Sequence, residues 1–377
     1  MSFLKKLLAL SMGVASLGGA YAKLDLSSSS NVVVYWGQNS LGQTGDLAQQ
    51  RLGYYCDDSN IDVIVLAFLT TINGQGGAPE VDFANAGDKC TIFEGTNLKN
   101  CPEIGEDITT CQQKGKTIIL SIGGATYSEG GFQSESAARD GADLVWKTFG
   151  PAQSSTAHVN TTVHYNATHR PIHDSIVRRQ NQNQVRRPFG DAVVDGFDFD
   201  FEAHVDNMAP FANRLRELSD ADTSKQYFLT AAPQCPYPDA ADKDILNGPV
   251  SIDAVFVQFY NNFCGVGSFV EGQDTQNSFN LETWDNWAKN DSQNKNAKVI
   301  VGVPANTGAA GSGYIPVTKL KSVIEYSKTF SSFGGVMMWD VSQAYGNDGF
   351  LQGTRQALGS TQSRISSRPY RYHPIRW

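Results

Sequence analysis

Long hydrophobic runs are scarce in this chain. After the first 22 residues there is no run of 18 apolar residues, so the sequence predicts no membrane-spanning helix. The polar, basic C-terminal stretch ending PYRYHPIRW also lacks the hydrophobic tail of a lipid-anchor signal. Basic residues are fewer than acidic ones, 30 Lys and Arg against 38 Asp and Glu. This acidic balance argues against nucleic acid and anionic membranes as partners.

Two motifs that would indicate other protein classes are absent. No C-x-x-C pair occurs, which argues against a zinc site. No G-x-G-x-x-G follows the first predicted strand, because GGAPEV and GAAGSG fall elsewhere in the chain. This second absence disfavours a doubly wound, dinucleotide-binding sheet.

The N-terminus has the layout of a secretory signal peptide. Two lysines precede an apolar run, and the small-residue pattern Ala-Tyr-Ala at 20–22 predicts cleavage after Ala22. Loss of Lys5 and Lys6 would take the formal charge from −8 to −10. We therefore expect a secreted, extracellular protein of about 355 residues that begins with a short polar lead, residues 23–30.

The six cysteines and the sequons are consistent with export. An even number of cysteines in an oxidising compartment predicts three disulfides, among about 15 ways to pair them. Sequons begin at Asn160, Asn166 and Asn290, as expected of a glycoprotein with surface loops. The cysteines are Cys56, Cys90, Cys101, Cys111, Cys235 and Cys264.

Short apolar, β-branched runs alternate with amphipathic stretches along the chain. Several runs are almost continuously apolar, as expected of parallel strands covered on both faces. Segments 129–150 and 316–330 have the composition of helices between them. The pattern predicts an α/β fold with a single (β/α)8 TIM barrel over residues 31–356. The runs are 31–37, 61–69, 116–124, 192–202, 227–233, 252–260, 298–305 and 334–342.

Residues 153–187 form an atypical insert. The insert is rich in His, Arg, Asn and Gln, and it precedes the fourth strand, which places it at the bottom of the barrel. His169 and His173 have i,i+4 spacing, but Pro171 between them argues against a helix that presents both to a metal. A disordered loop is favoured over a metal site, and non-coding sequence retained in the gene model is a third interpretation. The basic tail 357–377 is predicted to be disordered.

The stretch DGFDFDFE, residues 195–202, alternates acids with phenylalanines. On a strand Asp198, Asp200 and Glu202 share one face, and the three Phe share the other. In a barrel the acids would face the lumen near the C-terminal strand ends, and the Phe would pack on the outer helices. Three partly desolvated carboxylates repel one another, so they cannot all be ionised near neutral pH. A proton stored in this way suits the cleavage of a glycosidic bond.

Three other interpretations of this stretch are weaker. An exposed strand would put the Phe side chains in the core and the acids in water. A calcium site built from D-x-D-x-D would lack the Gly and the distal Glu of an EF-hand loop. A magnesium site on barrel carboxylates would have no phosphate-binding loop beside it. We therefore expect a site that needs no metal and no organic cofactor.

The acidic strand resembles the D-G-x-D-x-D-x-E motif of glycoside hydrolase family 18, and the chain is similar to class III chitinases of fungi and plants. VVVYWGQN, LSIGG, TAAPQCPYPD, VQFYNN and GGVMMWD resemble the first, third, fifth, sixth and eighth strands of that family. The likeness extends from Asn31 to about Gly353, apart from the insert. It implies a secreted, monomeric endo-chitinase that cleaves β-1,4-linked N-acetylglucosamine in chitin or chito-oligosaccharides with retention of configuration.

The resemblance also implies roles for individual residues. Glu202 matches the general acid that protonates the leaving sugar oxygen. Asp200 matches the residue that holds the substrate's 2-acetamido group, whose carbonyl oxygen attacks the anomeric carbon to give an oxazolinium ion. Asp198 would share the proton of Asp200, and Tyr260 would bond the acetamido oxygen. Trp339 matches the indole floor under the −1 sugar, although without the resemblance it would be assigned to the core.

Further residues are expected around this site. Ser121, Gln258 and Asn261 are candidates to line the pocket or fix its polar groups. Asp195 is expected to have a structural hydrogen-bond role. The two glycines of LSIGG are expected to allow close backbone approach rather than sugar contact.

The resemblance implies a disulfide pairing and leaves two other functions open. The implied pairs are Cys56 with Cys111, Cys90 with Cys101, and Cys235 with Cys264. Many fungal relatives continue into a chitin-binding module, but this chain ends in a basic tail, so cell-wall attachment stays open. The same barrel could serve a chitin-binding lectin-like or inhibitor protein, or an endo-β-N-acetylglucosaminidase acting on N-glycans. The presence of Glu202, Asp200 and Tyr260 favours an enzyme.

Overall fold

The computed structural model of the protein describes residues 24–152 and 185–359. The predicted signal peptide (1–22) lies outside the described residues, as do nearly all of the insert (153–187) and of the tail (357–377). The expectations for these three segments therefore stay predictions. The described residues on either side of the insert do lie between a helix and the following strand, as the sequence predicts.

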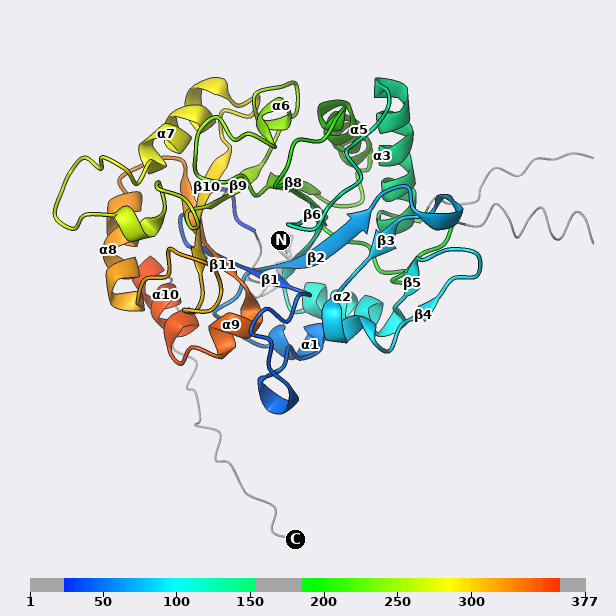
Figure 1. Ribbon diagram of the computed structural model, residues 1–377, viewed down its shortest axis with the longest axis horizontal. Helices are drawn as coiled ribbons and strands as arrows, with labels where there is room; N and C mark the ends of the chain where they lie inside the picture. The colour runs from blue at the N-terminus through cyan, green and yellow to red at the C-terminus, as the bar shows by residue number, and fades with distance from the viewer. Residues whose placement is uncertain (1–23, 153–184, 360–377) are drawn as a thin grey trace, which may run out of the picture.

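Eight parallel strands close into a barrel, which confirms the predicted fold class (Figure 1). The ring closes because β1 pairs in parallel with both β2 and β11. All eight predicted strands are present. They are β1 (Asn31–Trp36), β2 (Val63–Thr71), β6 (Thr117–Gly123), β7 (Gly196–Asp200), β8 (Phe228–Ala231), β9 (Ala254–Gln258), β10 (Lys298–Pro304) and β11 (Phe333–Trp339).

Three short strands were not predicted. β3 (Glu80–Val81) adds antiparallel to β2, and β4 (Thr91–Ile92) pairs with β5 (Lys99–Asn100) in a separate two-stranded sheet. Each of these strands has only two residues, which is too short for an alternating pattern to be recognised in a sequence.

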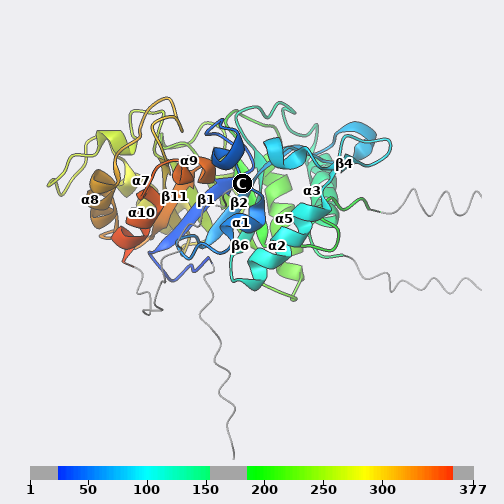
Figure 2. The same ribbon diagram turned by 90° about the horizontal axis from the view of Figure 1, so that it is seen from below.

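Helices surround the barrel, as the side view in Figure 2 also shows. No helix of the described residues is long and apolar enough to span a membrane. The α-helices are α1 (Leu52–Tyr55), α2 (Pro102–Gln113), α3 (Glu135–Phe149), α5 (Met208–Ala221), α6 (Lys243–Leu246), α7 (Leu281–Asn286), α8 (Val317–Ser327), α9 (Val341–Tyr345) and α10 (Phe350–Leu358). The 3-10 turns are Gly45–Leu47, Gln75–Gly77, Ala84–Gly87 and Val266–Ser268, and a π-helical turn spans Trp287–Asp291.

The alternation of side chains along the strands creates two separate hydrophobic cores. Val33, Tyr35 and Met337 belong to the core inside the barrel. The second core lies between the barrel and its helices, and it contains Phe197, Phe199 and Phe201. The three Phe of the acidic stretch therefore pack outward, as predicted, and the acids between them face the lumen.

Seven of the eight predicted strands end one to three residues earlier in the structure, and two of these ends bear on the site. β7 ends at Asp200, so Glu202 is not the last strand residue but lies in the loop that follows. β11 ends at Trp339 instead of continuing to 342, because Asp340 caps α9: its side chain accepts a hydrogen bond from the backbone N–H of Gln343 (3.0 Å). Local capping thus overrides the apolar pattern at this strand end.

The N-terminal end of the barrel is covered by the chain preceding β1 and fixed by α10. Leu24 packs in the barrel core, and its N–H donates to Thr117 Oγ1 (3.0 Å). Arg355 of α10 donates to the carbonyls of Ser30 and Asn60 and forms an ion pair with Asp62. The opposite end of the barrel, where all eight strands have their C-termini, is therefore the open one.

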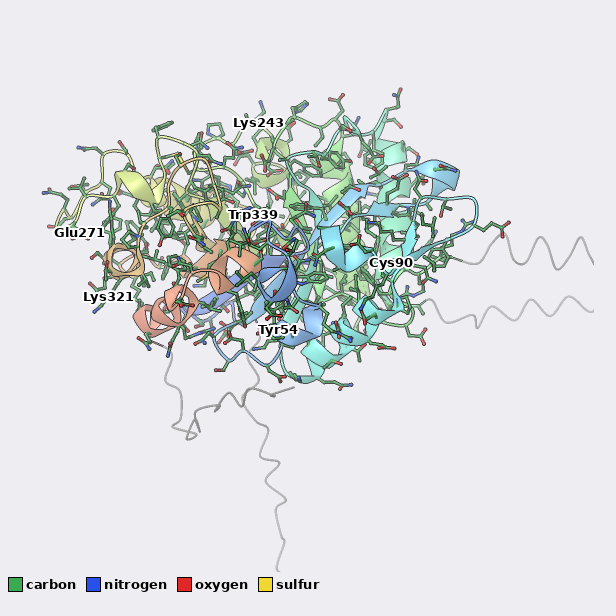
Figure 3. All side chains as sticks on the ribbon, turned by 60° about the horizontal axis from the view of Figure 1, so that its bottom comes forward. Tyr54, Cys90, Lys243, Glu271, Lys321 and Trp339 are labelled. Carbon is green, nitrogen blue, oxygen red and sulfur yellow. A yellow bond between two sulfur atoms is a disulfide. The ribbon has the colours of Figure 1, made fainter. Side chains whose placement is uncertain are left out.

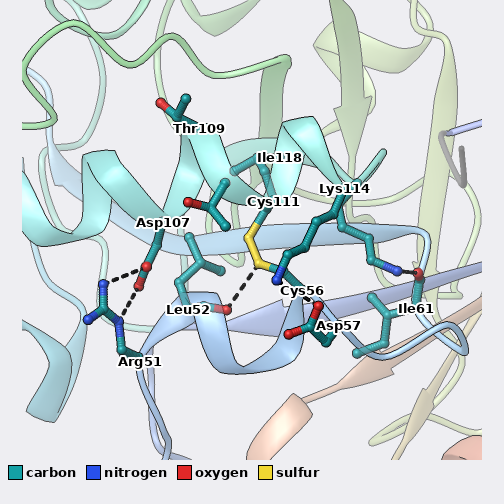
Figure 4. Close-up of a disulfide and its surroundings, with 12 residues drawn as sticks. Arg51, Leu52, Cys56, Asp57, Ile61, Asp107, Thr109, Cys111, Lys114 and Ile118 are labelled. Carbon is teal, nitrogen blue, oxygen red and sulfur yellow. Dashed lines mark hydrogen bonds and ion pairs between the residues drawn. A yellow bond between two sulfur atoms is a disulfide. The ribbon is translucent and has the colours of Figure 1, made fainter.

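Three disulfides link the loops and helices in the pairing that the resemblance implies: Cys56–Cys111, Cys90–Cys101 and Cys235–Cys264. Figure 4 shows the first, which joins the end of α1 to α2 beside the ion pair between Arg51 Nη2 and Asp107 Oδ1 (2.6 Å). The third joins the loop after β8 to the loop after β9, both at the C-terminal face of the barrel.

Candidate active site

The register of β6, β7 and β8 places three polar side chains next to one another inside the barrel. Asp198 of β7 is paired with Ser121 of β6 and with Thr230 of β8. Paired residues of parallel strands point to the same face of the sheet. All three side chains are fully buried in the lumen.

Asp198 accepts hydrogen bonds from three hydroxyl groups. Tyr35 Oη and Ser121 Oγ donate to Oδ2, and Thr230 Oγ1 donates to Oδ1, each at 2.7 Å. Burial raises the pKa of Asp198 above its ordinary value, and the three hydroxyls act in the opposite direction. All of its side-chain hydrogen bonds to described residues come from these hydroxyls, and none joins it to Asp200.

Asp200, two residues further along β7, has a different environment. It is almost fully buried, and its Oδ1 accepts a hydrogen bond from Gln258 Nε2 (2.9 Å). Burial, followed by the charges of Asp198 and Glu202, raises the pKa of Asp200 well above its ordinary value. Asp200 is therefore the member of the acidic trio that holds a proton most firmly.

Glu202 lies at the mouth of the barrel, beyond the end of β7. Its side chain is exposed on one side and lines the cavity on the other. Partial burial, followed by the charge of Asp239, raises the pKa of Glu202. A carboxyl group that keeps its proton at the cavity mouth can act as a general acid.

Tyr260 and Gly123 complete the wall around Asp200. Tyr260 lies just beyond β9 and is nearly buried, and burial together with Asp200 and Glu202 raises the pKa of its hydroxyl well above the ordinary value. The hydroxyl therefore stays neutral and can donate a hydrogen bond. Gly123 has φ +122°, and a Cβ there would lie 2.2 Å from the carbonyl oxygen of Asp200, so the close backbone approach predicted for LSIGG is real.

Trp339 forms an aromatic surface at the end of β11. Its ring stacks on Phe68, with centroids 6.0 Å apart and planes 19° apart, and it lies 5.5 Å from the ring of Tyr35. The indole is only half-buried. In Figure 3 Trp339 lies near the middle of the molecule, whereas Tyr54, Cys90, Lys243, Glu271 and Lys321 lie around it.

Asp200, Glu202, Tyr260 and Trp339 are among the side chains that line a cavity of about 260 Å³, whereas Ser121 lies below it, fully buried against Asp198. No Lys, Arg or His is among its lining residues. No cluster of His, Cys, Asp or Glu suited to a metal ion occurs in residues 24–152 and 185–359. The lining residues are Gln38, Phe68, Ala125, Thr126, Asp200, Glu202, Gln234, Gln258, Tyr260, Asn261, Ala309 and Trp339.

Two predicted residues have mainly structural contacts. Asn261 lines the cavity, but its Oδ1 accepts the backbone N–H of Ser312 (3.0 Å) and so joins two loops. Asp195 lies outside the cavity at the start of β7. Its Oδ2 accepts the backbone N–H of Ile118 (2.8 Å), and its Oδ1 accepts Lys225 Nζ (2.7 Å).

Several residues of the site were not predicted from the sequence, among them Tyr35, Thr230, Phe68 and Asp239. The alternation of Val33 and Tyr35 already predicts that Tyr35 points inward, so its place could have been inferred. Thr230 needs the register between β7 and β8, and Asp239 needs the course of a loop. Both residues lie in TAAPQCPYPD, the stretch that resembles the fifth strand of the family, but this likeness gives neither the register nor the course of the loop.

The comparisons with known proteins agree with this geometry. Residues 31–328 match the sequence model of the glycosyl hydrolases family 18. The chain belongs to this family, and it is therefore a glycoside hydrolase.

Two curated relatives and one solved structure are informative. A class III chitinase of Arthroderma benhamiae is 49% identical over 99% of this chain and 99% of its own length. Endochitinase 33 of Trichoderma harzianum is 47% identical over 91% of this chain and 96% of its own length. The structure of a xylanase and α-amylase inhibitor protein from Scadoxus multiflorus covers 86% of this chain and 97% of its own, at 28% identity and a TM-score of 0.62.

Proposed function

We propose that the protein is a secreted endo-chitinase that cleaves β-1,4 linkages between N-acetylglucosamine units with retention of configuration. The observation that carries the proposal is the carboxyl of Glu202 at the mouth of a cavity whose inner wall holds the buried Asp200, with the pKa of both carboxyls raised above the ordinary value. Relatives named chitinase and endochitinase, at 49% and 47% identity, support the substrate.

The nucleophile in this proposal comes from the substrate. Neither strand carboxyl is suited to attack the anomeric carbon, because the pKa of Asp200 is raised well above its ordinary value and Asp198 is buried and bonded to three hydroxyls. The carbonyl oxygen of the substrate's acetamido group attacks instead and forms an oxazolinium ion, while Asp200 and the Tyr260 hydroxyl hold that group. This route is an exception to the two-carboxylate scheme.

The remaining steps use Glu202 twice. Its proton passes to the leaving sugar oxygen, and the resulting carboxylate then removes a proton from the water that opens the oxazolinium ion. The half-buried indole of Trp339 packs against the −1 sugar, the ring on the non-reducing side of the scissile bond. Catalysis through these side chains needs no metal and no organic cofactor.

A similar barrel also occurs in an inhibitor protein at 28% identity, so an activity assay has to distinguish hydrolysis from sugar binding alone. A fluorogenic chitobioside separates the two, because a binding protein takes up the sugar without releasing the dye. Cleavage of a high-mannose glycoprotein in place of chitin would indicate an endo-β-N-acetylglucosaminidase.

The substitution Glu202→Gln tests the assignment of the acid. The amide keeps the shape of the side chain but has no proton to transfer, so we expect turnover of chito-oligosaccharides to fall by about 10²–10⁴-fold. Calorimetric binding of the oligosaccharide should be retained. Glu282→Gln, at an exposed position on α7, is the matched control and should retain full activity. Undiminished hydrolysis by Glu202→Gln would exclude Glu202 as the acid.

A further inference from the structure

Asp239 is a buried carboxylate at the cavity that the proposed reaction does not use. It lies in the loop between β8 and α6, and only 5% of its surface is exposed. The backbone N–H of Gln234 donates to its Oδ2 at 3.0 Å. Because Gln234 lines the same cavity as Glu202, Asp239 lies directly behind the cavity wall.

The backbone around Asp239 favours its ionised form. In addition to Gln234, the N–H groups of Ala241 and Asp242 donate to its Oδ1, at 2.8 and 2.6 Å. Three donors on one carboxylate stabilise the negative charge, although burial opposes it and raises the pKa of Asp239. The donors also fix the carboxylate in one position.

Asp242, in contrast to Asp239, has surroundings that favour its neutral form. It is fully buried, and neither of its carboxyl oxygens has a hydrogen-bond partner among the described residues. Burial, followed by the charge of Asp239, raises the pKa of Asp242 well above its ordinary value. Of these two neighbouring carboxyls, Asp242 therefore holds the proton and Asp239 holds the charge.

Of the ionisable groups around Glu202, Asp239 is the one whose negative charge acts on it. Asp200 of β7 is neutral, and so is the Tyr260 hydroxyl after β9. Asp198 lies deeper in the lumen, bonded to its three hydroxyls. The cavity lining contains no basic side chain, and His204, just past Glu202, is exposed and bonded to Asp206.

We propose that Asp239 is a positioning residue for the acid: its fixed negative charge behind the cavity wall keeps Glu202 protonated between turnovers. This inference rests on the proposed function, since it takes Glu202 as the acid. It differs from the interpretation drawn from the sequence, in which the crowded carboxylates of the acidic strand themselves store the catalytic proton. Asp200 on the strand holds its own proton, and the loop carboxylate of Asp239 keeps Glu202 protonated. The direction agrees with the raised pKa of Glu202, whose causes are burial and then Asp239.

The substitution Asp239→Asn tests the inference through the pH profile of kcat/KM for the N-acetylglucosamine tetramer. Without the charge Glu202 loses its proton at lower pH, so the alkaline limb should move to lower pH. The ratio of kcat/KM near pH 8 to that near pH 5 should fall by roughly threefold or more. Asp244→Asn removes the same charge from an exposed position on α6 and should leave the profile unchanged.

A second substrate separates this role from a structural one. A 2,4-dinitrophenyl chitobioside has a leaving group that needs no proton, so its alkaline limb should be the same for Asp239→Asn and for the wild type. If Asp239→Asn does not fold, Asp239→Ser, whose hydroxyl can still accept a backbone N–H, replaces it. An unmoved limb with the tetramer, or equal losses with both substrates, would overturn the inference. A wild-type protein that does not cleave the tetramer at all would instead overturn the proposed function.

Discussion

The buried carboxyl groups of this barrel differ in the number of hydrogen bonds that the surrounding residues donate to them. Asp198 is fully buried and bonded by three hydroxyls, whereas the equally buried Asp242 has no partner among the described residues. Burial alone favours the neutral acid, and hydrogen-bond donors favour the carboxylate. Identical side chains at identical burial therefore have different protonation preferences, which is the basis of the proposed division of roles.

The neutral form of Asp242 has a consequence for stability. Its pKa in the folded protein is raised, so the folded state keeps the proton while the unfolded state releases it above the ordinary value of 3.8. The contribution of Asp242 to stability is complete below that value and is lost as the pH rises toward the folded pKa. The loss has a slope of up to about 1.4 kcal/mol per pH unit.

Asp242→Asn should remove this pH-dependent loss. In urea unfolding between about pH 4 and pH 8, we expect the free energy of unfolding of the variant to rise relative to the wild type as the pH increases. Asp244→Asn should follow the wild type, since this side chain is exposed. Parallel curves for Asp242→Asn and the wild type would show that Asp242 is not neutral in the folded protein.

The site residues on strands could be predicted because their spacing is fixed by the strand. The alternation in DGFDFDFE identifies Asp198 and Asp200 and the side of the barrel on which they lie. Residues that reach the site from loops, such as Asp239, or through the register of a neighbour, such as Thr230, could not be predicted. Their places depend on the path of the folded chain, which no local pattern specifies.

At the scale of elements, apolar runs identify all eight barrel strands but not their ends. The predicted strand 192–202 begins in the structure only at Gly196, because Phe189 to Asp195 form turns and a connection to β7. β11 ends where Asp340 caps α9. Hydrophobic patterns thus report which residues are buried, while side-chain hydrogen bonds decide where an element stops.

The disulfide Cys235–Cys264 joins two elements of the cleft. It links the loop that carries Gln234 to the loop that follows Tyr260, across 29 residues. Asn262 Nδ2 also donates to Gln234 Oε1 (3.0 Å), so the disulfide and this hydrogen bond hold the same two loops together. We infer that this disulfide supports the cleft as well as the fold.

The double substitution of Cys235 and Cys264 by Ala should therefore affect both stability and substrate affinity. We expect the free energy of unfolding to fall by about 2–4 kcal/mol and KM to rise, because the loops on either side of the cleft loosen. Removal of Cys90–Cys101, which spans 11 residues and involves no residue that lines the cavity, is the control. That control should lose stability without a change in KM. Equal changes in KM for the two double variants would contradict the role in the cleft.

At the scale of the whole molecule, the closed barrel brings together side chains from distant parts of the chain. Tyr35 of β1 and Asp198 of β7 are 163 residues apart and are joined by a hydrogen bond of 2.7 Å. The ring closes between β1 and β11, and Arg355 of α10 fixes the chain that precedes β1. The position of the site at the C-terminal face follows from this closure.

The central claim is that the acetamido group of the substrate, and not free water, attacks the anomeric carbon first. Attack from within the substrate, followed by attack of water from the face that the leaving group occupied, retains the configuration of the sugar.

Proton NMR of the wild-type protein acting on the N-acetylglucosamine tetramer tests this claim most directly. The spectrum recorded before mutarotation should show the β-anomer at the newly formed reducing end. A product that appears first as the α-anomer would mean that water attacks directly, and it would contradict the mechanism derived from the acidic strand.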